Sequence, residues 1–427
     1  MLAHIRDCTV IEARRVLGDD SWDMTVDELM AFIALVYVRG AYGGWNMELS
    51  SFWSAEWGFS FFKETMSRNR FQIIMRFLRF DKKETRSARI QISKFALINE
   101  VWEGFVNNSI SCYKPGADIT VDEQLLPTKA RCSFIQYMAN KPDKFGIKMW
   151  LAADVTTKYM LNGAPYLGKD DTRRAGQRLG DSVVLNLVEP FTGKGRNVTT
   201  DNFFTSLKLA EELQSKKTSL VGTMNKSRRE LPPCVKEKSP LFSTKLLKHN
   251  SVTLTVYQCK AQKNVCVLST AHTTAGTLSG PKAKPEPVVY YNHTKVGVDV
   301  LDQMIRKYSV KAPTRRWPVV VFYNLLDIAA INALVLFRKC LNVTISRRDF
   351  ILELAKQLRA NYMRNKDPRV CGEPSVEEEP PSCRKRKQCQ VRQHCTKNRS
   401  HEACQKCKKV VCGKCTGNVV VTCKKCI

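Results

Sequence analysis

The segment GADITVDEQ at 116–124 opens the part of the chain that decides the fold. Three further segments resemble strands in their alternation of apolar and polar residues, namely CSFIQYMAN (132–140), FGIKMWLAAD (145–154) and KYMLNGAPYLG (158–168). Turn-forming residues such as NKPDK separate them. A meander of three strands fits this region best.

Helices and strands alternate in the residues that follow. An amphipathic stretch, GDSVVLNLVEPF (180–191), precedes a short strand, RNVTTD (196–201). A helix, SLKLAEELQSKK (206–217), and a further strand, SLVGTM (219–224), complete the pattern. The order strand-strand-strand-helix-strand-helix-strand predicts an α/β fold with an RNase H-like core, in which helices flank a mixed sheet.

The pattern changes on both sides of this core. Apolar residues recur at helical spacing near the start of the chain and again after residue 293, whereas strand-like runs between basic and proline-rich turns follow residue 225. The predicted parts are a helical region (1–113), the first part of the core (114–225), a β-rich insertion (226–290), the helical last part of the core (291–370), a linker with a basic run (371–387) and a cysteine-rich domain (388–427).

The charge of the chain points to a nucleic-acid partner. Lys and Arg number 69 against 40 Asp and Glu, a net charge of +29, and an excess of this size is typical of proteins that bind nucleic acid or an anionic membrane surface. The apolar run at 29–38 is too short to cross a bilayer, and Asp327 and Asn332 interrupt the one at 319–337. We therefore expect buried helices there and no membrane partner.

Acidic residues fall at positions that a mixed sheet brings to one edge. Asp122 alternates with Val121 along its strand and shares a face with Thr120, while Asp201 ends the strand RNVTTD. Asp299 and Asp302 stand three apart and share a helix face. Each Asp taken singly is also explained as a turn or cap residue.

Taken together, these carboxylates predict a metal site. Clustered negative charges repel one another unless a cation neutralises them, and hard oxygen ligands favour Mg²⁺ or Mn²⁺ over zinc. We expect two such ions at Asp122, Asp201 and Asp299. Two ions of this kind support phosphodiester chemistry, with water as the nucleophile for strand cleavage and a DNA 3′-hydroxyl for strand transfer.

The C-terminal cysteines predict a zinc-binding domain. The first residues contain no apolar signal segment, so secretion and a disulfide framework are not expected. Nine of the 17 cysteines lie between Cys383 and Cys426. The expected ligands are Cys389 with Cys395 and three Cys-x2-Cys pairs, Cys404 and Cys407, Cys412 and Cys415, and Cys423 and Cys426.

Four successive pairs indicate two Zn²⁺ ions in a cross-brace, in which the first and third pairs share one ion and the second and fourth share the other. His394 is an alternative to Cys395, and His401 and Cys383 are possible substitutes. Zinc acts in such a domain as scaffold, displaying basic residues on its surface.

Basic residues near the acidic motifs are candidate DNA contacts. The predicted set is Arg131, Lys141, Arg228, Arg229, Lys295, Arg315, Arg316 and Trp317, with arginines and lysines on phosphates and the indole on a base. A solvated surface is the alternative for scattered lysines, and core packing is the alternative for Trp317. The run RKRK at 384–387 predicts nuclear import or a phosphate-binding arm.

Seven strings in this chain resemble the piggyBac transposases. They are ITVDEQLLP (119–127), YMANKPDKFGIK (137–148), TKYMLNGAPYLGK (157–169), NVTTDNFFTSLKLAEEL (197–213), VGTMNKSRRELP (221–232), YYNHTKVGVDVLDQM (290–304) and RRWPVVVFYNLLDIAAINA (315–333). The strings follow the family's order, and the cysteine-rich tail matches more loosely.

The resemblance implies that Asp122, Asp201 and Asp299 are a catalytic triad and that Asp302 is an additional acidic residue of the site. It also implies cut-and-paste transposition through hairpinned ends, insertion at TTAA, binding of double-stranded terminal repeats, a homodimer and a nuclear location. Region 1–113 would serve dimerisation and DNA binding. This chain departs from the family at Val296 and Ala130, where glycines are usual, and has a short region ahead of Asp122.

Three other functions are compatible with parts of the sequence. A domesticated descendant would bind DNA or chromatin without cutting it. A ubiquitin ligase would use a cross-brace zinc domain, but this reading leaves the acidic motifs and the positive charge unexplained. An RNase H-type nuclease would cleave without strand transfer.

Overall fold

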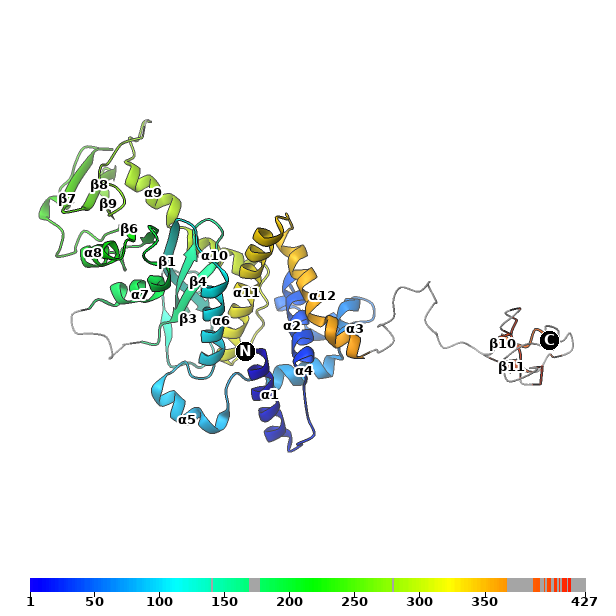
Figure 1. Cartoon of the computed structure of the whole chain (residues 1–427). Helices are drawn as coiled ribbons and strands as arrows, with labels where there is room; N and C mark the ends of the chain where they lie inside the picture. The colour runs from blue at the N-terminus through cyan, green and yellow to red at the C-terminus, as the bar shows by residue number, and fades with distance from the viewer. Residues whose placement is uncertain are drawn as a thin grey trace. The chain divides into compact units, whose positions relative to one another are not determined.

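The computed structural model describes residues 1–139, 141–168, 177–278 and 280–366, and in the tail residues 387–391, 395, 398–400, 403–404, 407, 409–412 and 414–415. The chain divides into two compact units, Met1–Asp367 and Pro368–Ile427 (Figure 1).

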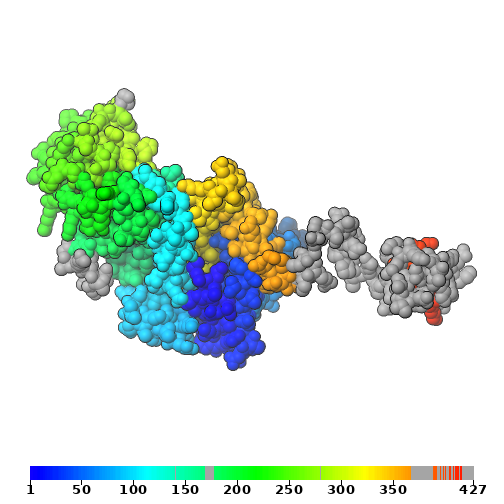
Figure 2. All heavy atoms as spheres, viewed as in Figure 1, coloured from blue at the N-terminus to red at the C-terminus, as the bar shows by residue number. Residues whose placement is uncertain are grey.

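Helices fill the first part of the larger unit. They are α1 (Leu2–Leu17), α2 (Val26–Ala41), α3 (Ser60–Thr65), α4 (Arg68–Phe77), α5 (Lys83–Ile92) and α6 (Asn99–Cys112), with short 3-10 turns at Gly44–Asn46 and Leu49–Trp53. The hydroxyl of Thr25 accepts the N–H of Glu28 at 3.0 Å and starts α2. Helix α2 is almost wholly buried because it packs along α12 (Arg347–Lys366) from the other end of the unit. The space-filling view shows the orange residues of α12 beside the blue N-terminal part of the chain (Figure 2).

The sheet has the predicted RNase H-like order. Its strands are β1 (Asp118–Pro127), β2 (Ile135–Tyr137), β3 (Phe145–Asp154), β4 (Met160–Pro165), β5 (Asn197–Thr200) and β6 (Ser219–Thr223). β1, β3 and β4 form the antiparallel meander, with the short β2 beside the start of β3. β5 and β6 then run parallel to β1. The mixed α/β architecture is therefore confirmed.

Each face of this sheet supports its own core. Ile119 and Val121 of β1 pack with α7 (Leu179–Val188) and α8 (Leu207–Ser215). A short 3-10 turn, Glu189–Phe191, follows α7. On the opposite face, residues of β3 such as Leu151 pack with α10 (Gly297–Lys307) and α11 (Trp317–Leu341). The side chains of β1 that face α10 and α11 include Thr120, Asp122 and Gln124, because alternate residues of a strand share a face.

The residues after β6 extend the same sheet. They form a 3-10 turn (Pro233–Val235) and strands β7 (Thr244–His249), β8 (Val252–Lys260) and β9 (Lys263–Ser269). β9 pairs antiparallel with β6, so the insertion continues the core sheet. Helix α9 (Glu286–Thr294) returns the chain to the centre of the core.

Helix α11 is long and apolar enough to cross a membrane, but 78% of its most apolar window is buried inside the unit. This placement is that of a core helix. In the tail, β10 (Lys387–Gln388) pairs with β11 (Arg399–Ser400).

Candidate active site and zinc cluster

Two neighbouring parallel strands bring the first two predicted carboxylates together. The register pairs Val121 of β1 with Thr200 of β5, so Asp122 and Asp201 are the next residues on adjacent strands. The carboxylate of Asp201 accepts the N–H of Phe203 at 2.9 Å, and that of Asp122 accepts the N–H of Glu123 at 2.8 Å. Both carboxylates therefore lie where β5 ends beside the middle of β1.

Helix α10 supplies the third carboxylate because it approaches β1 closely. The hydroxyl of Thr120 donates to the carbonyl of Thr294 at 2.5 Å. A Cβ atom on Gly297 would lie 2.6 Å from Thr120 Oγ1, which is closer than such atoms approach. Glycine at 297 thus allows α10 to start against the strand, with Asp299 exposed in its first turn.

The electrostatics of these residues reflect crowded negative charge. Burial, together with the negative charges of Glu123, Asp201 and Asp299, raises the pKa of Asp122 to about 7. Burial also raises the pKa of Asp201, with Glu123 adding to the effect. A bound cation relieves such repulsion, and carboxylate oxygens are the hard donors that Mg²⁺ and Mn²⁺ prefer.

Lys148, which the sequence offers as a phosphate contact or a solvated surface residue, brings a positive charge to this cluster. Its Nζ lies 3.5 Å from Glu123 Oε2 and 4.0 Å from the ring centroid of Trp150. Its half-exposed neighbour Phe203 stacks on Trp150 with ring centroids 5.4 Å apart. Burial lowers the pKa of Lys148, while the charges of Glu123, Asp201 and Asp122 raise it.

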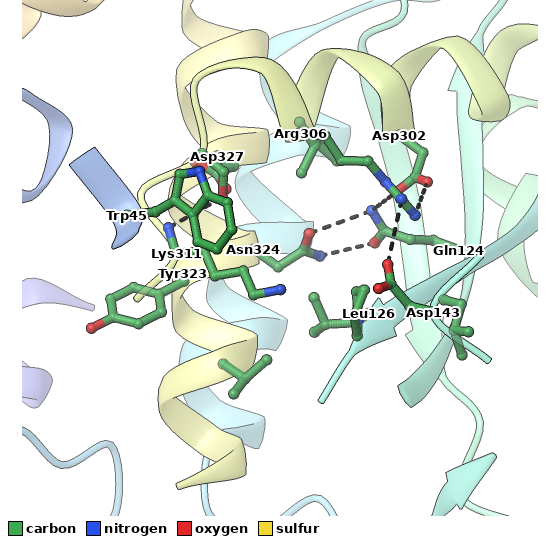
Figure 3. Close-up of a pocket in the computed structure, with 15 residues that line it drawn as sticks. Trp45, Gln124, Leu126, Asp143, Asp302, Arg306, Lys311, Tyr323, Asn324 and Asp327 are labelled. Atoms are coloured by element: carbon green, nitrogen blue, oxygen red, sulfur yellow. Dashed lines mark hydrogen bonds and ion pairs between the residues drawn. The ribbon is translucent and has the colours of Figure 1, made fainter. Parts of the chain in front are cut away.

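Asp302 faces a different environment from Asp299 (Figure 3). One carboxylate oxygen accepts Gln124 Nε2 at 2.9 Å, and the other lies 3.0 Å from Arg306 Nη2. Arg306 also lies 3.5 Å from Asp143. Both oxygens of Asp302 are thus engaged by protein groups.

The Gln124 side chain continues this network into α11. Asn324 Nδ2 donates to Gln124 Oε1 at 2.9 Å, and both side chains are 2% exposed. The amide pair forms one wall of a cavity of about 250 Å³, with Trp45 and Lys311 on its far side (Figure 3). Gln124 shares the strand face of Asp122, a period-two signal that could have indicated its position; nothing local indicates Asn324 or Arg306.

Two of the predicted DNA contacts, Arg316 and Trp317, interact with other parts of the protein. Trp317 is 8% exposed, and its ring lies 5.6 Å from that of Phe95 and 5.1 Å from that of Phe134. Arg316 donates to the carbonyls of Leu78 and Met75, at 2.9 and 2.5 Å, and so caps the end of α4. The indole and the guanidinium are therefore engaged by packing and capping, and for Trp317 this agrees with the core-packing alternative that the sequence left open.

The other predicted DNA contacts are at least partly accessible. Arg228 Nη2 donates to the carbonyl of Asn202, next to Asp201, at 2.7 Å. Lys141 Nζ lies 3.5 Å from the carbonyl of Glu123. The remaining side chains are exposed, namely Arg131, Arg229, Lys295 and Arg315.

In the tail, four cysteines come together. The sulfur atoms of Cys389, Cys395, Cys412 and Cys415 all lie within 4.8 Å of one another. These are the first and third predicted pairs, which a cross-brace places on one ion, and four thiolates fit tetrahedral Zn²⁺.

The second predicted zinc site is only partly visible. Cys404 is buried and Cys407 is half-buried. Their expected partners Cys423 and Cys426 lie outside the described residues, as do His394, His401, Cys383, the linker at 371–386 and Arg384, Lys385 and Arg386 of the basic run.

Known proteins resemble this chain over its whole length. A family model described as Transposase IS4 matches residues 1–334. A piggyBac transposase in a synaptic complex with hairpin DNA, determined by cryo-electron microscopy, superposes with a TM-score of 0.81 at 29% identity, covering 100% of this chain and 94% of that one.

Human relatives match a smaller part. PiggyBac transposable element-derived protein 3 is 28% identical over 221 residues, which are 46% of this chain and 36% of the relative. PiggyBac transposable element-derived protein 2 is 26% identical over 224 residues, 48% of this chain and 38% of the relative. The matched region thus spans little more than a third of these curated relatives.

Proposed function

Because the chain belongs to the Transposase IS4 family, we propose that it is a DNA transposase of the piggyBac kind, which cuts and rejoins DNA at TTAA sites. The observation that supports this proposal is that Asp122 and Asp201 directly follow a pair of residues on adjacent strands of an RNase H-like sheet. The charges of Asp201 and Asp299 also contribute to the raised pKa of Asp122.

In the proposed mechanism, Asp122, Asp201 and Asp299 would hold two Mg²⁺ or Mn²⁺ ions. When bound, such ions supply Lewis-acid stabilisation of the attacking and leaving oxygens of an in-line displacement. Lys148 is held by Glu123 and Trp150 beside the carboxylates, where its ammonium group would hold a phosphate oxygen of the scissile strand. In strand cleavage, water attacks the phosphorus and the P–O3′ bond breaks, which releases a 3′-hydroxyl and leaves a 5′-phosphate. In strand transfer, that 3′-hydroxyl attacks the phosphorus of a second phosphodiester and displaces its 3′-oxygen as a new hydroxyl.

The surroundings of this site suit a DNA duplex. Lys141 contacts the backbone carbonyl of Glu123, next to Asp122, and Arg228 contacts that of Asn202, next to Asp201. Arg229 follows Arg228 in the sequence, Lys295 precedes Asp299 on the chain, and both are exposed. We propose that these four residues contact phosphates. A homodimer, recognition of terminal repeats by the zinc domain, and a nuclear location belong to the same proposal.

Cleavage of a labelled duplex tests the proposal. The substrate carries a terminal repeat flanked by TTAA, and the control has the TTAA scrambled with the repeat unchanged. With Mg²⁺ or Mn²⁺ we expect nicking at the repeat end of the TTAA substrate only, followed by a hairpin product. Binding of both duplexes without cleavage of either, under any divalent ion, would contradict it.

That second outcome describes the alternative function, a domesticated transposase-derived protein that binds DNA or chromatin. Two observations favour it. The human relatives are named as transposable element-derived proteins, and this chain has Val296 and Ala130 near the carboxylates where the resembling family usually has glycines.

A further inference from the structure

Five arginines surround one cavity on the larger unit. The cavity measures about 300 Å³, and its floor is apolar, including Leu78, Trp317 and Val319. Its charged lining comprises Arg79, Arg86, Arg131, Arg315, Arg316 and a single carboxylate, that of Asp81. These arginines come from three separate parts of the chain, so sequence order alone does not reveal the cluster.

Three of the guanidinium groups are fixed by the protein. Arg86 makes two bonds of 2.8 Å to Asp81, and the side chain of Asp81 is only 2% exposed. Arg79 lies 3.0 Å from Glu12, and Arg316 is held by backbone carbonyls. Because these side chains are already fixed, ligand binding does not have to include the entropy cost of ordering them.

The two neighbouring carboxylates do not neutralise the cavity. Asp81 is shared between Arg86 and Arg89, and Glu12 is shared between Arg79 and Arg15. Each acidic group thus already faces two positive charges. Burial, together with the charge of Arg79, lowers the pKa of Arg316 to about 10, so the group stays protonated at neutral pH.

Arg131 and Arg315 are the members without a protein partner. Both are exposed, and within the described residues neither side chain has a hydrogen bond or an ion pair. An arginine fork matches the oxygens of a phosphate group better than any other side chain does. The apolar floor and the fixed positive charges behind the two forks strengthen the attraction for an anion.

We propose that this cavity binds a phosphate group, and that the phosphate belongs to the DNA backbone. The inference rests on the proposed function, because that function supplies the duplex. Arg131 and Arg315 contact the phosphate oxygens directly, and Arg79, Arg86 and Arg316 provide the positive field. A free phosphate ion offers the same chemistry and is the second possible source.

Salt-dependent binding of a fluorescent duplex to the full-length protein tests the proposal. Divalent ions that support cleavage are left out, and no chelator is added, so that the tail keeps its metal. Arg131→Ala/Arg315→Ala is compared with Lys208→Ala/Lys216→Ala, which removes the same charge from exposed positions at α8 that do not line the cavity. We expect roughly ten-fold weaker binding for the arginine variant, on repeat and random duplexes alike.

The dependence of the DNA-binding constant on salt concentration distinguishes a direct phosphate contact from a change in the overall charge of the protein. Loss of one phosphate contact lowers the slope of log K against log salt by about 0.9. We expect this change in the arginine variant, recovery of the slope in Arg131→Lys/Arg315→Lys, and little change in the α8 control. Equal affinity and slope for the arginine variant and the wild type would overturn the proposal.

The source of the phosphate is tested by thermal unfolding in inorganic phosphate against chloride at equal ionic strength. Stabilisation of the wild type but not of Arg131→Ala/Arg315→Ala, together with unchanged DNA binding, would identify a free-anion site and overturn the DNA contact. A wild-type protein that binds no duplex at all would instead refute the proposed function, which the cleavage assay tests independently.

Discussion

The two acidic residues of α10 have different surroundings although they share a helix face. Asp299 is exposed, and its charge contributes to the raised pKa of Asp122. Asp302 has one oxygen on Gln124 and the other on Arg306. We infer that Asp299 is the metal ligand and that Asp302 fixes the helix that carries it.

This difference predicts unequal effects of the two amide substitutions. Asp299→Asn should lower the single-turnover cleavage rate by on the order of 100-fold or more, because it removes charge that neutralises the ions. Asp302→Asn should lower it by roughly ten-fold or less, because an amide retains one acceptor and the overall shape. Equal losses in the two variants would show that Asp302 is also a ligand.

Residue roles were predictable where they depend on local pattern. The positions of Asp122 and Asp201 follow from strand periodicity and the order of elements. The burial of Trp317 depends on Phe95 and Phe134, which are distant in sequence, and the capping role of Arg316 depends on the end of α4. A basic or aromatic residue gives no local sign of such distant partners.

At the scale of elements, the amide pair of Gln124 and Asn324 joins β1 to α11. Replacing either residue by leucine leaves the other amide buried without its partner, which costs roughly 1–3 kcal/mol of unfolding free energy. The double variant Gln124→Leu/Asn324→Leu should cost less than the sum of the single variants. Urea denaturation followed by tryptophan fluorescence measures this, since all seven tryptophans precede residue 367. Strictly additive losses would contradict the coupling.

Asp327 on α11 predicts that the stability of the helical packing depends on pH. It is 3% exposed, and burial raises its pKa to about 7 although Ser309 and the N–H of Val310 donate to it. The charges of Arg347 on α12 and Arg39 on α2 lower that pKa, and Tyr37 of α2 also lies close enough to interact with it.

Because the folded protein holds the Asp327 proton more tightly than the unfolded chain does, this group lowers the free energy of unfolding as pH rises from about 4 to about 7. Asp327→Asn should remove this loss. The quantity to compare is the unfolding free energy of the variant minus that of the wild type. This difference should be larger at pH 8 than at pH 5 by roughly 1–3 kcal/mol. A difference that does not change with pH in urea titrations would refute the raised pKa.

The element order was the most predictable feature of the fold, because each strand and helix of the core has its own periodicity. The attachment of the insertion was not predictable in this way. β9 pairs with β6 across a long stretch of chain, and its alternating pattern would suit any sheet edge.

At the scale of the whole molecule, the chain consists of a larger unit and a cysteine-rich tail. We expect two zinc ions per chain, with Cys389, Cys395, Cys412 and Cys415 holding one of them. Cys412→Ser should therefore reduce the zinc content measured by elemental analysis from two ions to one. The thermal unfolding of the core, read from tryptophan fluorescence, should stay the same. An unchanged zinc content would contradict the assignment of this cluster.

The central claim is that carboxylates at one edge of the sheet perform metal-dependent DNA cleavage. The most direct test is the rate of Mg²⁺- or Mn²⁺-dependent nicking of the TTAA-flanked repeat by the wild type, by Asp201→Asn and by a matched control, Asp349→Asn, whose side chain is exposed on α12. We predict nicking by the wild type and the control, and loss of nicking with retained DNA binding in Asp201→Asn. Equal nicking by all three proteins would contradict the claim.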